Sequence, residues 1–332
     1  MLDMQTDSNP LNESAFFPIL YGGYLYIEGE HQVSFLQRQT TNDIRMLSPG
    51  GCMISVLTSP AGRILDVLSV LNGGKTQSGG SGSQGLNLVT LPGRGRTTTT
   101  YLKSHIFFMD KVTVEDRSQD FIQIEVFGLQ VESQFRTLGY PRLPAEGEVL
   151  SVEGENPGLI YKTQGTIGLG FRIIASAVQG EWWISSLRRA GATQLDWPEF
   201  NLLRVEVGIP WVEAELNEDY TPLETNLVGA ISYSKGCYTG QEVIARQTTY
   251  DKVTQHLCGL RLEKRVEPGA RLLAEGKRVG KVTSVAESSR FGWIALAMIK
   301  RPYHQPGSVL DVATDSGEPV RAQTVTLPFS KA

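Results

Sequence analysis

The sequence predicts an α+β fold that ends in a small all-β barrel or sandwich. Up to about residue 255, strand-like and helix-like segments alternate with hairpins between them, which favours α+β over a doubly wound parallel sheet. Beyond that point, short apolar strands are separated by Pro-Gly and Glu-Gly turns, a spacing typical of a small barrel or sandwich. The 332 residues suffice for two or three domains.

The first part of the chain carries short apolar runs and a few amphipathic stretches. Residues 8–17 are expected to form a loose leader, and 72–85, with six glycines, a surface loop. A Pro-Gly turn at 59–62 predicts a hairpin. The expected strands are 24–27, 53–57, 64–71, 86–91, 121–127, 159–160 and 169–174. The expected helices are 30–44, 97–108, 181–190 and 196–208.

The part of the chain after about residue 255 is predicted to contain strands only. Turns of the Glu-Pro-Gly, Glu-Gly and Gln-Pro-Gly type recur between its apolar runs. The expected strands are 257–262, 271–274, 281–285, 293–298 and 308–312.

Composition limits the compartment and the partners. The chain has 31 Lys and Arg against 35 Asp and Glu, a net charge of −4, so no overall basic field captures nucleic acid directly. An odd count of three cysteines indicates a reducing compartment. An acidic start lacks the basic region of a signal peptide, and the longest apolar run, 293–299, is too short for a bilayer. We therefore expect a cytoplasmic protein without membrane contact.

Glu206 is a candidate binding residue. It follows Leu202 and Leu203 by one helical turn, at the edge of an apolar stripe of the helix expected at 196–208. A carboxylate there can accept two parallel hydrogen bonds from a planar edge, either an arginine or the aminopyrimidine of a pterin. The alternative is a glutamate that is exposed or paired with an arginine.

The run from Ser234 to Glu242 contains the sharpest local motif. Thr239-Gly-Gln-Glu242 matches a capping box and predicts a helix that starts at Thr239 and runs through Arg246. Cys237 would then precede a helix N-terminus with Lys235 nearby, and both features favour the thiolate. The alternative is a small buried cysteine.

Metal binding is not expected. His256 and Cys258 share one face of a strand, but two ligands without a second pair indicate a structural role. The chain has no Cys-x-x-Cys motif, so it is not expected to hold an iron–sulfur cluster of its own.

The octapeptide from Lys235 to Glu242 resembles the signature of the YgfZ family, the folate-binding relatives of the glycine-cleavage T-protein, an aminomethyltransferase. The resemblance covers nearly the whole chain. The other matching stretches are Phe35-Leu36-Gln37, Thr41-Asn42-Asp43, Gly62-Arg63-Ile64-Leu65-Asp66, Arg204-Val-Glu206-Val-Gly208-Ile-Pro210, Thr221-Pro222 and Asn226-Leu227.

This resemblance implies a three-domain cloverleaf of the T-protein type, with a C-terminal barrel and a central channel for tetrahydrofolate. The expected division is 1–125 with 210–255 as the folate-binding core, 126–209 as a second α+β domain and 256–332 as the barrel. Glu206 matches the glutamate that holds the pterin. The other expected site residues are Asp66, Arg246 and Tyr238 for the cofactor, and Cys237 and Lys235 for catalysis.

Two departures from the T-protein pattern bear on the reaction. Val67 stands where the T-protein has its catalytic aspartate, and valine cannot accept a proton, which disfavours aminomethyl transfer. Cys237 stands where the T-protein has an acid. The resemblance implies a folate-dependent role in assembly or repair of iron–sulfur proteins, with radical tRNA-modifying enzymes as clients and an indirect effect on tRNA thiomethylation. An aminomethyltransferase of glycine cleavage and a non-catalytic scaffold remain the alternatives.

Overall fold

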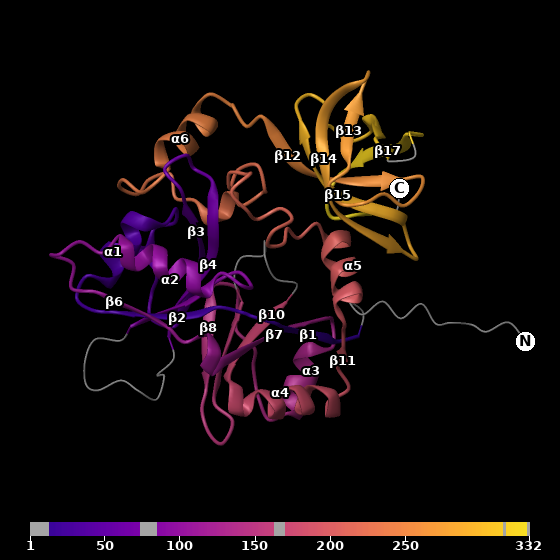
Figure 1. Cartoon of the computed structure of the whole chain (residues 1–332). Helices are drawn as coiled ribbons and strands as arrows, with labels where there is room; N and C mark the ends of the chain where they lie inside the picture. The colour runs from indigo at the N-terminus through magenta and orange to yellow at the C-terminus, as the bar shows by residue number, and fades with distance from the viewer. Residues whose placement is uncertain (1–12, 74–84, 163–169, 315–316, 331–332) are drawn as a thin grey trace, which may run out of the picture. The chain divides into compact units, whose positions relative to one another are not determined.

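The computed structural model describes residues 13–73, 85–162, 170–314 and 317–330 (Figure 1). Most of the glycine-rich stretch 72–85 lies outside these residues. The chain divides into two compact units. The first unit comprises Met1–Leu36, Ile44–Ile54 and Leu68–Asp196, and the second comprises Gln37–Asp43, Ser55–Val67 and Trp197–Ala332.

One large sheet forms the centre of the first unit, and the tip of its β3–β4 hairpin belongs to the second unit. Among the described residues it has eleven strands in the order β11-β1-β7-β10-β9-β8-β3-β4-β5-β2-β6. The strands are β1 (Ala15–Ile19), β2 (Tyr24–Glu28), β3 (Gly51–Thr58), β4 (Ile64–Asn72), β5 (Leu86–Val89), β6 (Thr113–Asp116), β7 (Phe121–Phe127), β8 (Glu148–Val152), β9 (Gly158–Lys162), β10 (Phe171–Ser176) and β11 (Thr193–Gln194).

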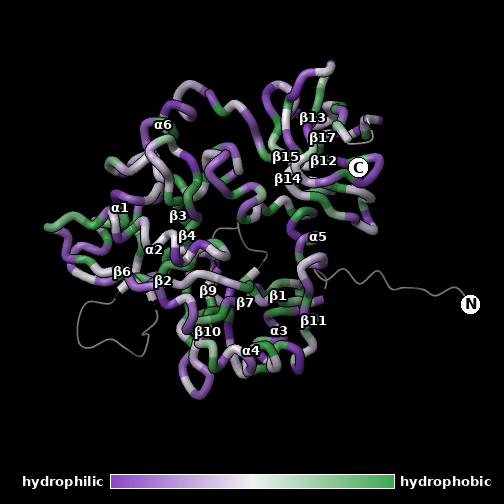
Figure 2. The backbone as a smooth tube through the Cα atoms, viewed as in Figure 1, coloured by the Kyte–Doolittle hydropathy of each residue, from purple (hydrophilic) through white to green (hydrophobic). Residues whose placement is uncertain are grey.

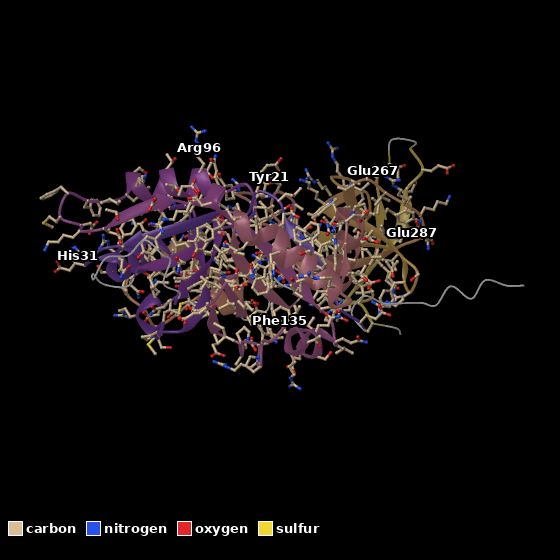
Figure 3. The ribbon with its side chains drawn as sticks, turned by 90° about the horizontal axis from the view of Figure 1, so that it is seen from below. Tyr21, His31, Arg96, Phe135, Glu267 and Glu287 are labelled. Carbon is tan, nitrogen blue, oxygen red and sulfur yellow. The ribbon has the colours of Figure 1, made fainter. Side chains whose placement is uncertain are left out.

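Helices in this part of the chain bury apolar side chains against the sheet. Trp183 of α4 and Phe135 of α3 are fully buried, with their ring centroids 6.4 Å apart. In Figure 3, Phe135 lies among packed side chains, whereas Arg96 projects into solvent. Ser176 caps α4, and Gly191 follows its end in a left-handed conformation. The helices are α1 (Gln32–Gln39), α2 (Gly95–Ser104), α3 (Val131–Thr137) and α4 (Ala177–Arg189), with the short helices η1 (Ile44–Met46) and η2 (Ser118–Asp120).

The second unit contains a closed six-stranded barrel with the strand order β12-β15-β14-β13-β16-β17. Apolar side chains fill its interior, and hydrophobic and hydrophilic residues alternate along the strands (Figure 2). The barrel strands are β12 (Gln255–Leu262), β13 (Arg271–Ala274), β14 (Lys277–Ser288), β15 (Gly292–Lys300), β16 (Val309–Val312) and β17 (Val320–Val325). The helices of this unit are α5 (Trp197–Val207), η3 (Val228–Ala230) and α6 (Gln241–Thr249).

The prediction of mixed α and β structure followed by an all-β barrel is confirmed. The expectation of a loose leader over 8–17 is wrong for its described end. Ala15 to Phe17 belong to β1, which pairs with β7, and Phe16 is fully buried. The burial of this strand outweighs the polar residues that precede it. The division into three domains stays a prediction.

Candidate functional site

Helix α5 holds two charged residues of the candidate site in a buried position. Gly208 ends the helix with a φ of +85°, and a Cβ there would lie 2.8 Å from the Cβ of Leu327. Only glycine both adopts this left-handed conformation without strain and lacks a side chain that would clash with Leu327. The helix therefore stops directly after Arg204 and Glu206, whose side chains are both buried.

The Glu206 carboxylate has a partner on each oxygen. Ser288 Oγ donates a 2.6 Å hydrogen bond to Oε1, and the Arg290 guanidinium pairs with Oε2. Glu206 is 5 % exposed, so of the two simple alternatives the exposed glutamate is excluded and the arginine-paired one is realised. The carboxylate is thus buried, charge-compensated and already oriented toward planar N–H donors.

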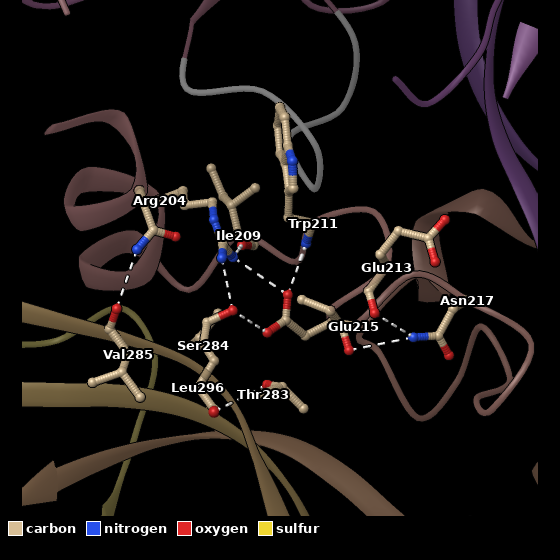
Figure 4. A network of polar contacts seen from close by, with 12 residues as sticks. Arg204, Ile209, Trp211, Glu213, Glu215, Asn217, Thr283, Ser284, Val285 and Leu296 are labelled. Atoms are coloured by element: carbon tan, nitrogen blue, oxygen red, sulfur yellow. Dashed lines mark hydrogen bonds and ion pairs between the residues drawn. The ribbon is translucent and has the colours of Figure 1, made fainter. Parts of the chain in front are cut away.

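A second buried ion pair lies on the same helix (Figure 4). Arg204 Nη1 lies 3.3 Å from Glu215 Oε2, and Arg204 Nη2 donates to Ser284 Oγ at 2.7 Å. Ser284 in turn donates to Glu215 Oε1 at 2.6 Å. Burial holds the pKa of Arg204 below its usual value although the Glu215 carboxylate opposes that shift. This network, together with the Glu206 contacts, fixes α5 against β14 of the barrel.

The loop that carries Cys237 is anchored by its neighbours. Lys235 is 5 % exposed, and its Nζ donates to the backbone oxygens of Thr40 and Asn42 at 2.6 and 2.7 Å. The carbonyl of Thr239 accepts a 2.6 Å hydrogen bond from Thr58 Oγ1. Cys237 itself is exposed. The loop thus presents the thiol to solvent from a backbone that is held on both sides.

The predicted capping box is wrong. Helix α6 begins at Gln241 with Gly240 as its N-cap in a left-handed conformation, and no described side chain caps it. A Cβ at position 240 would lie 2.7 Å from the carbonyl oxygen of Ser59. Packing of this segment against the tip of the β3–β4 hairpin therefore outweighs the local capping preference of Thr239. A role for the α6 N-terminus and for Lys235 in activating Cys237 stays a prediction.

The three predicted cofactor residues other than Glu206 have different surroundings. Tyr238 packs with Leu223, Ile231 and Ile244, and burial raises the pKa of its hydroxyl to about 12. Asp66 is fully buried and accepts a 2.8 Å hydrogen bond from the backbone N–H of Val67.

Arg246 lies on α6, is largely exposed and pairs with Glu242 at 3.0 Å. Lys235, Cys237 and Tyr238 thus share one loop, while Glu206 belongs to the network of α5 and β14. The assignment of all these residues to folate or catalysis stays a prediction.

The other two cysteines differ from Cys237. Cys52 and Cys258 are buried, and burial raises the pKa of each thiol to about 12. His256 stacks on His304 with ring centroids 4.5 Å apart. Across the described parts of the chain, no three His, Cys, Asp or Glu side chains are grouped so as to hold a metal ion.

Sequence reasoning missed the partners of α5, namely Glu215, Ser284, Ser288 and Arg290. Ser284 and Ser288 stand on β14, about eighty residues beyond α5 in the chain. Strand β14 carries several polar residues, so no signal in the sequence singles out these two serines.

A folate is the cofactor that the sequence resemblance implies, and the Glu206 carboxylate is the group expected to accept hydrogen bonds from it. The guanidinium now on Oε2 presents the same kind of planar N–H edge as an aminopyrimidine, so a pterin would compete with Arg290 for the carboxylate.

None of the helices within the described ranges is long and apolar enough to cross a membrane.

Comparisons with known proteins agree with this architecture. Residues 255–331 match the model of the glycine cleavage T-protein C-terminal barrel domain. The chain is 28 % identical to "Putative transferase At1g60990, chloroplastic" of Arabidopsis thaliana over 88 % of this chain and 67 % of that protein. It is 29 % identical to an aminomethyltransferase of Rippkaea orientalis over 95 % of this chain and 86 % of that protein.

The fold matches the crystal structure of the glycine cleavage system aminomethyltransferase T from Bartonella henselae with a TM-score of 0.83. That match covers 96 % of this chain and 87 % of that one at 19 % identity, and it confirms the predicted T-protein type of fold. Residues 255–331 therefore match the C-terminal barrel domain of the glycine cleavage T-protein, and the chain as a whole is similar in sequence and fold to proteins named aminomethyltransferase.

Proposed function

We propose that this protein binds tetrahydrofolate and, through Cys237, supports the assembly or repair of iron–sulfur proteins. The observation that carries the proposal is the exposed thiol of Cys237 on an anchored loop, where the T-protein pattern has an acid. A thiolate is a strong nucleophile and a soft ligand for iron, whereas a carboxylate is a weaker nucleophile and a hard oxygen ligand. The iron–sulfur clients, among them radical tRNA-modifying enzymes, come from the resemblance to the YgfZ family.

Glu206 is the residue proposed to hold the pterin. Its buried carboxylate would accept hydrogen bonds from the aminopyrimidine edge, and the Arg204–Glu215 pair would keep α5 in place while the cofactor exchanges with Arg290. When bound, tetrahydrofolate supplies a one-carbon carrier. The residues of the chain bind and orient it, and Cys237 supplies the reactive sulfur.

Aminomethyl transfer is the rival activity, since the relative from Rippkaea orientalis is named an aminomethyltransferase. Val67 argues against it, because this side chain is fully buried and apolar where the T-protein places its catalytic acid. An assay with the glycine-cleavage carrier protein separates the two. Turnover at the rate of a T-protein would replace our proposal with the rival.

Folate binding is tested by native mass spectrometry of the purified full chain and by calorimetry with tetrahydrofolate. Loss of one charged hydrogen-bond acceptor weakens binding by about tenfold or more, so we expect this for Glu206→Gln. Glu287→Gln, an exposed glutamate on β14, is the matched control and should bind like the wild type. Unchanged affinity of Glu206→Gln would remove this residue from the site.

The role of the thiol is tested in a strain that lacks its own family member. We expect the wild-type chain to restore the activity of iron–sulfur enzymes and Cys237→Ser to fail, with folate affinity unchanged. Full rescue by Cys237→Ser would leave the scaffold alternative in place.

The odd cysteine count also leads us to propose a reducing, cytoplasm-like compartment.

A further inference from the structure

A second polar pocket lies in the second unit, apart from the residues discussed above. Its volume is about 350 Å³. Residues 219–220, the start of β12 and strands β14 and β15 form its walls. It is lined by Asp219, Tyr220, Gln255, Arg278, Gly280, Lys281, Met298 and Lys300.

Three cations of this pocket project from two neighbouring strands. Lys281 pairs across the sheet with Met298, and Lys300 lies two residues further along β15, so both occupy the outer face. The register between β13 and β14 shifts at Val279, and this bulge turns Arg278 toward the same face as Lys281. Among the described residues, none offers an ion pair or a side-chain hydrogen bond to Arg278, Lys281 or Lys300.

Tyr220 adds a hydroxyl group to this cationic surface. The residue is 4 % exposed and lines the pocket, and no described residue forms a hydrogen bond with its Oη. Burial raises the pKa of this phenol to about 12, so the group stays protonated and can donate. A hydroxyl donor beside three cations that have no ion-pair partner among the described residues forms a surface suited to a negatively charged acceptor.

We propose that this pocket binds a doubly charged oxyanion group, either a phosphate or a pair of neighbouring carboxylates. Arg278, Lys281 and Lys300 supply three positive charges, and Asp219 offsets one of them. Lysine and arginine recognise phosphate and carboxylate through charge-assisted hydrogen bonds, and the Tyr220 hydroxyl adds a neutral donor. This chemistry occurs in free phosphate compounds and in an oligo-γ-glutamyl chain. The site stands on its own geometry and does not depend on folate binding at Glu206.

Calorimetry on the full chain with pyrophosphate and with tri-γ-glutamate tests the proposal. We expect at least one probe to bind and its affinity to fall with added salt. Loss of one charge-assisted hydrogen bond costs about tenfold in affinity, which we expect for Lys281→Ala and for Tyr220→Phe. Lys264→Ala, an exposed lysine of the barrel unit outside the pocket, is the matched control and should leave affinity unchanged.

The two probes also identify the source of the anion. Binding of pyrophosphate alone would assign the pocket to phosphate compounds, and binding of tri-γ-glutamate alone to a glutamyl chain. Failure of both probes to bind the wild type would overturn the proposal, as would an equal loss in Lys264→Ala and Lys281→Ala. Thermal unfolding followed by circular dichroism checks that each variant folds. Should Tyr220→Phe not fold, Lys281→Ala and the more exposed Lys300→Ala still decide the result.

Discussion

The Glu206 region and the Cys237 loop use charged residues in opposite ways. In the Glu206 region, Glu206, Arg204 and Glu215 are buried, and each is compensated by an oppositely charged partner. In the Cys237 loop, the ammonium of Lys235 donates hydrogen bonds to backbone carbonyls, and the thiol of Cys237 is exposed to solvent. The first arrangement positions a helix and a carboxylate, and the second presents a thiol.

The two regions differ in how a substitution changes the free energy of unfolding. A buried ion pair contributes little net stability by itself, but removal of one partner leaves an uncompensated charge. Replacement of an anchoring lysine removes its hydrogen bonds and, for Lys235, the contact of the ammonium with the Tyr238 ring, but it leaves no uncompensated charge behind. The two regions should therefore differ in how strongly single substitutions destabilise the fold.

The largest effect is expected for Glu215→Ala. This change leaves the Arg204 guanidinium buried without its carboxylate partner, and such losses cost about 3–5 kcal/mol. Urea unfolding followed by tryptophan fluorescence measures the free energy. The control is Glu242→Ala, which breaks the exposed pair with Arg246 and should change stability by less than about 0.5 kcal/mol. Equal effects in both variants would contradict the distinction between the regions.

A smaller effect is expected for Lys235→Met. The substitution keeps the approximate length of the side chain and removes its hydrogen bonds to Thr40 and Asn42, of which the first is buried, with an expected loss of about 2–3 kcal/mol in unfolding free energy. Lys264→Met, at an exposed position, serves as the control. The alkylation rate of Cys237 in the same variant gives a second measurement. A tenfold fall at mildly acidic pH would show that the ammonium also favours the thiolate, while an unchanged rate would make Lys235 an anchor only.

Much of the fold could be predicted from the sequence, because apolar and polar residues alternate locally along the barrel strands and along most strands of the large sheet. It did not predict β1, whose apolar residues follow a polar stretch and are recognised only by their pairing with β7. Strand β17 was also missed, although Val320, Ala322 and Thr324 alternate with exposed residues.

The candidate site was predicted less completely. Glu206 was singled out, but Ser288 and Arg290 approach it only when the barrel packs on α5. The capping box failed for a related reason, since the hairpin tip restrains Gly240. Contacts between distant segments leave no periodic pattern in the sequence, and this limits what local reasoning can predict.

The smallest expected effect concerns the difference in reactivity between Cys237 and the two buried cysteines. We expect iodoacetamide at pH 8 to modify Cys237 in the native protein and to modify Cys52 and Cys258 only after unfolding, as peptide mass spectrometry would detect. Burial raises the pKa of the latter two from 9.0 to about 12, so the folded state holds their protons more tightly than the unfolded state. The stability from these groups is complete below about pH 9 and is lost as pH rises toward 12. Cys258→Val should make this alkaline decline shallower, and an unchanged slope, or rapid native labelling of Cys258, would show that burial does not protect this thiol.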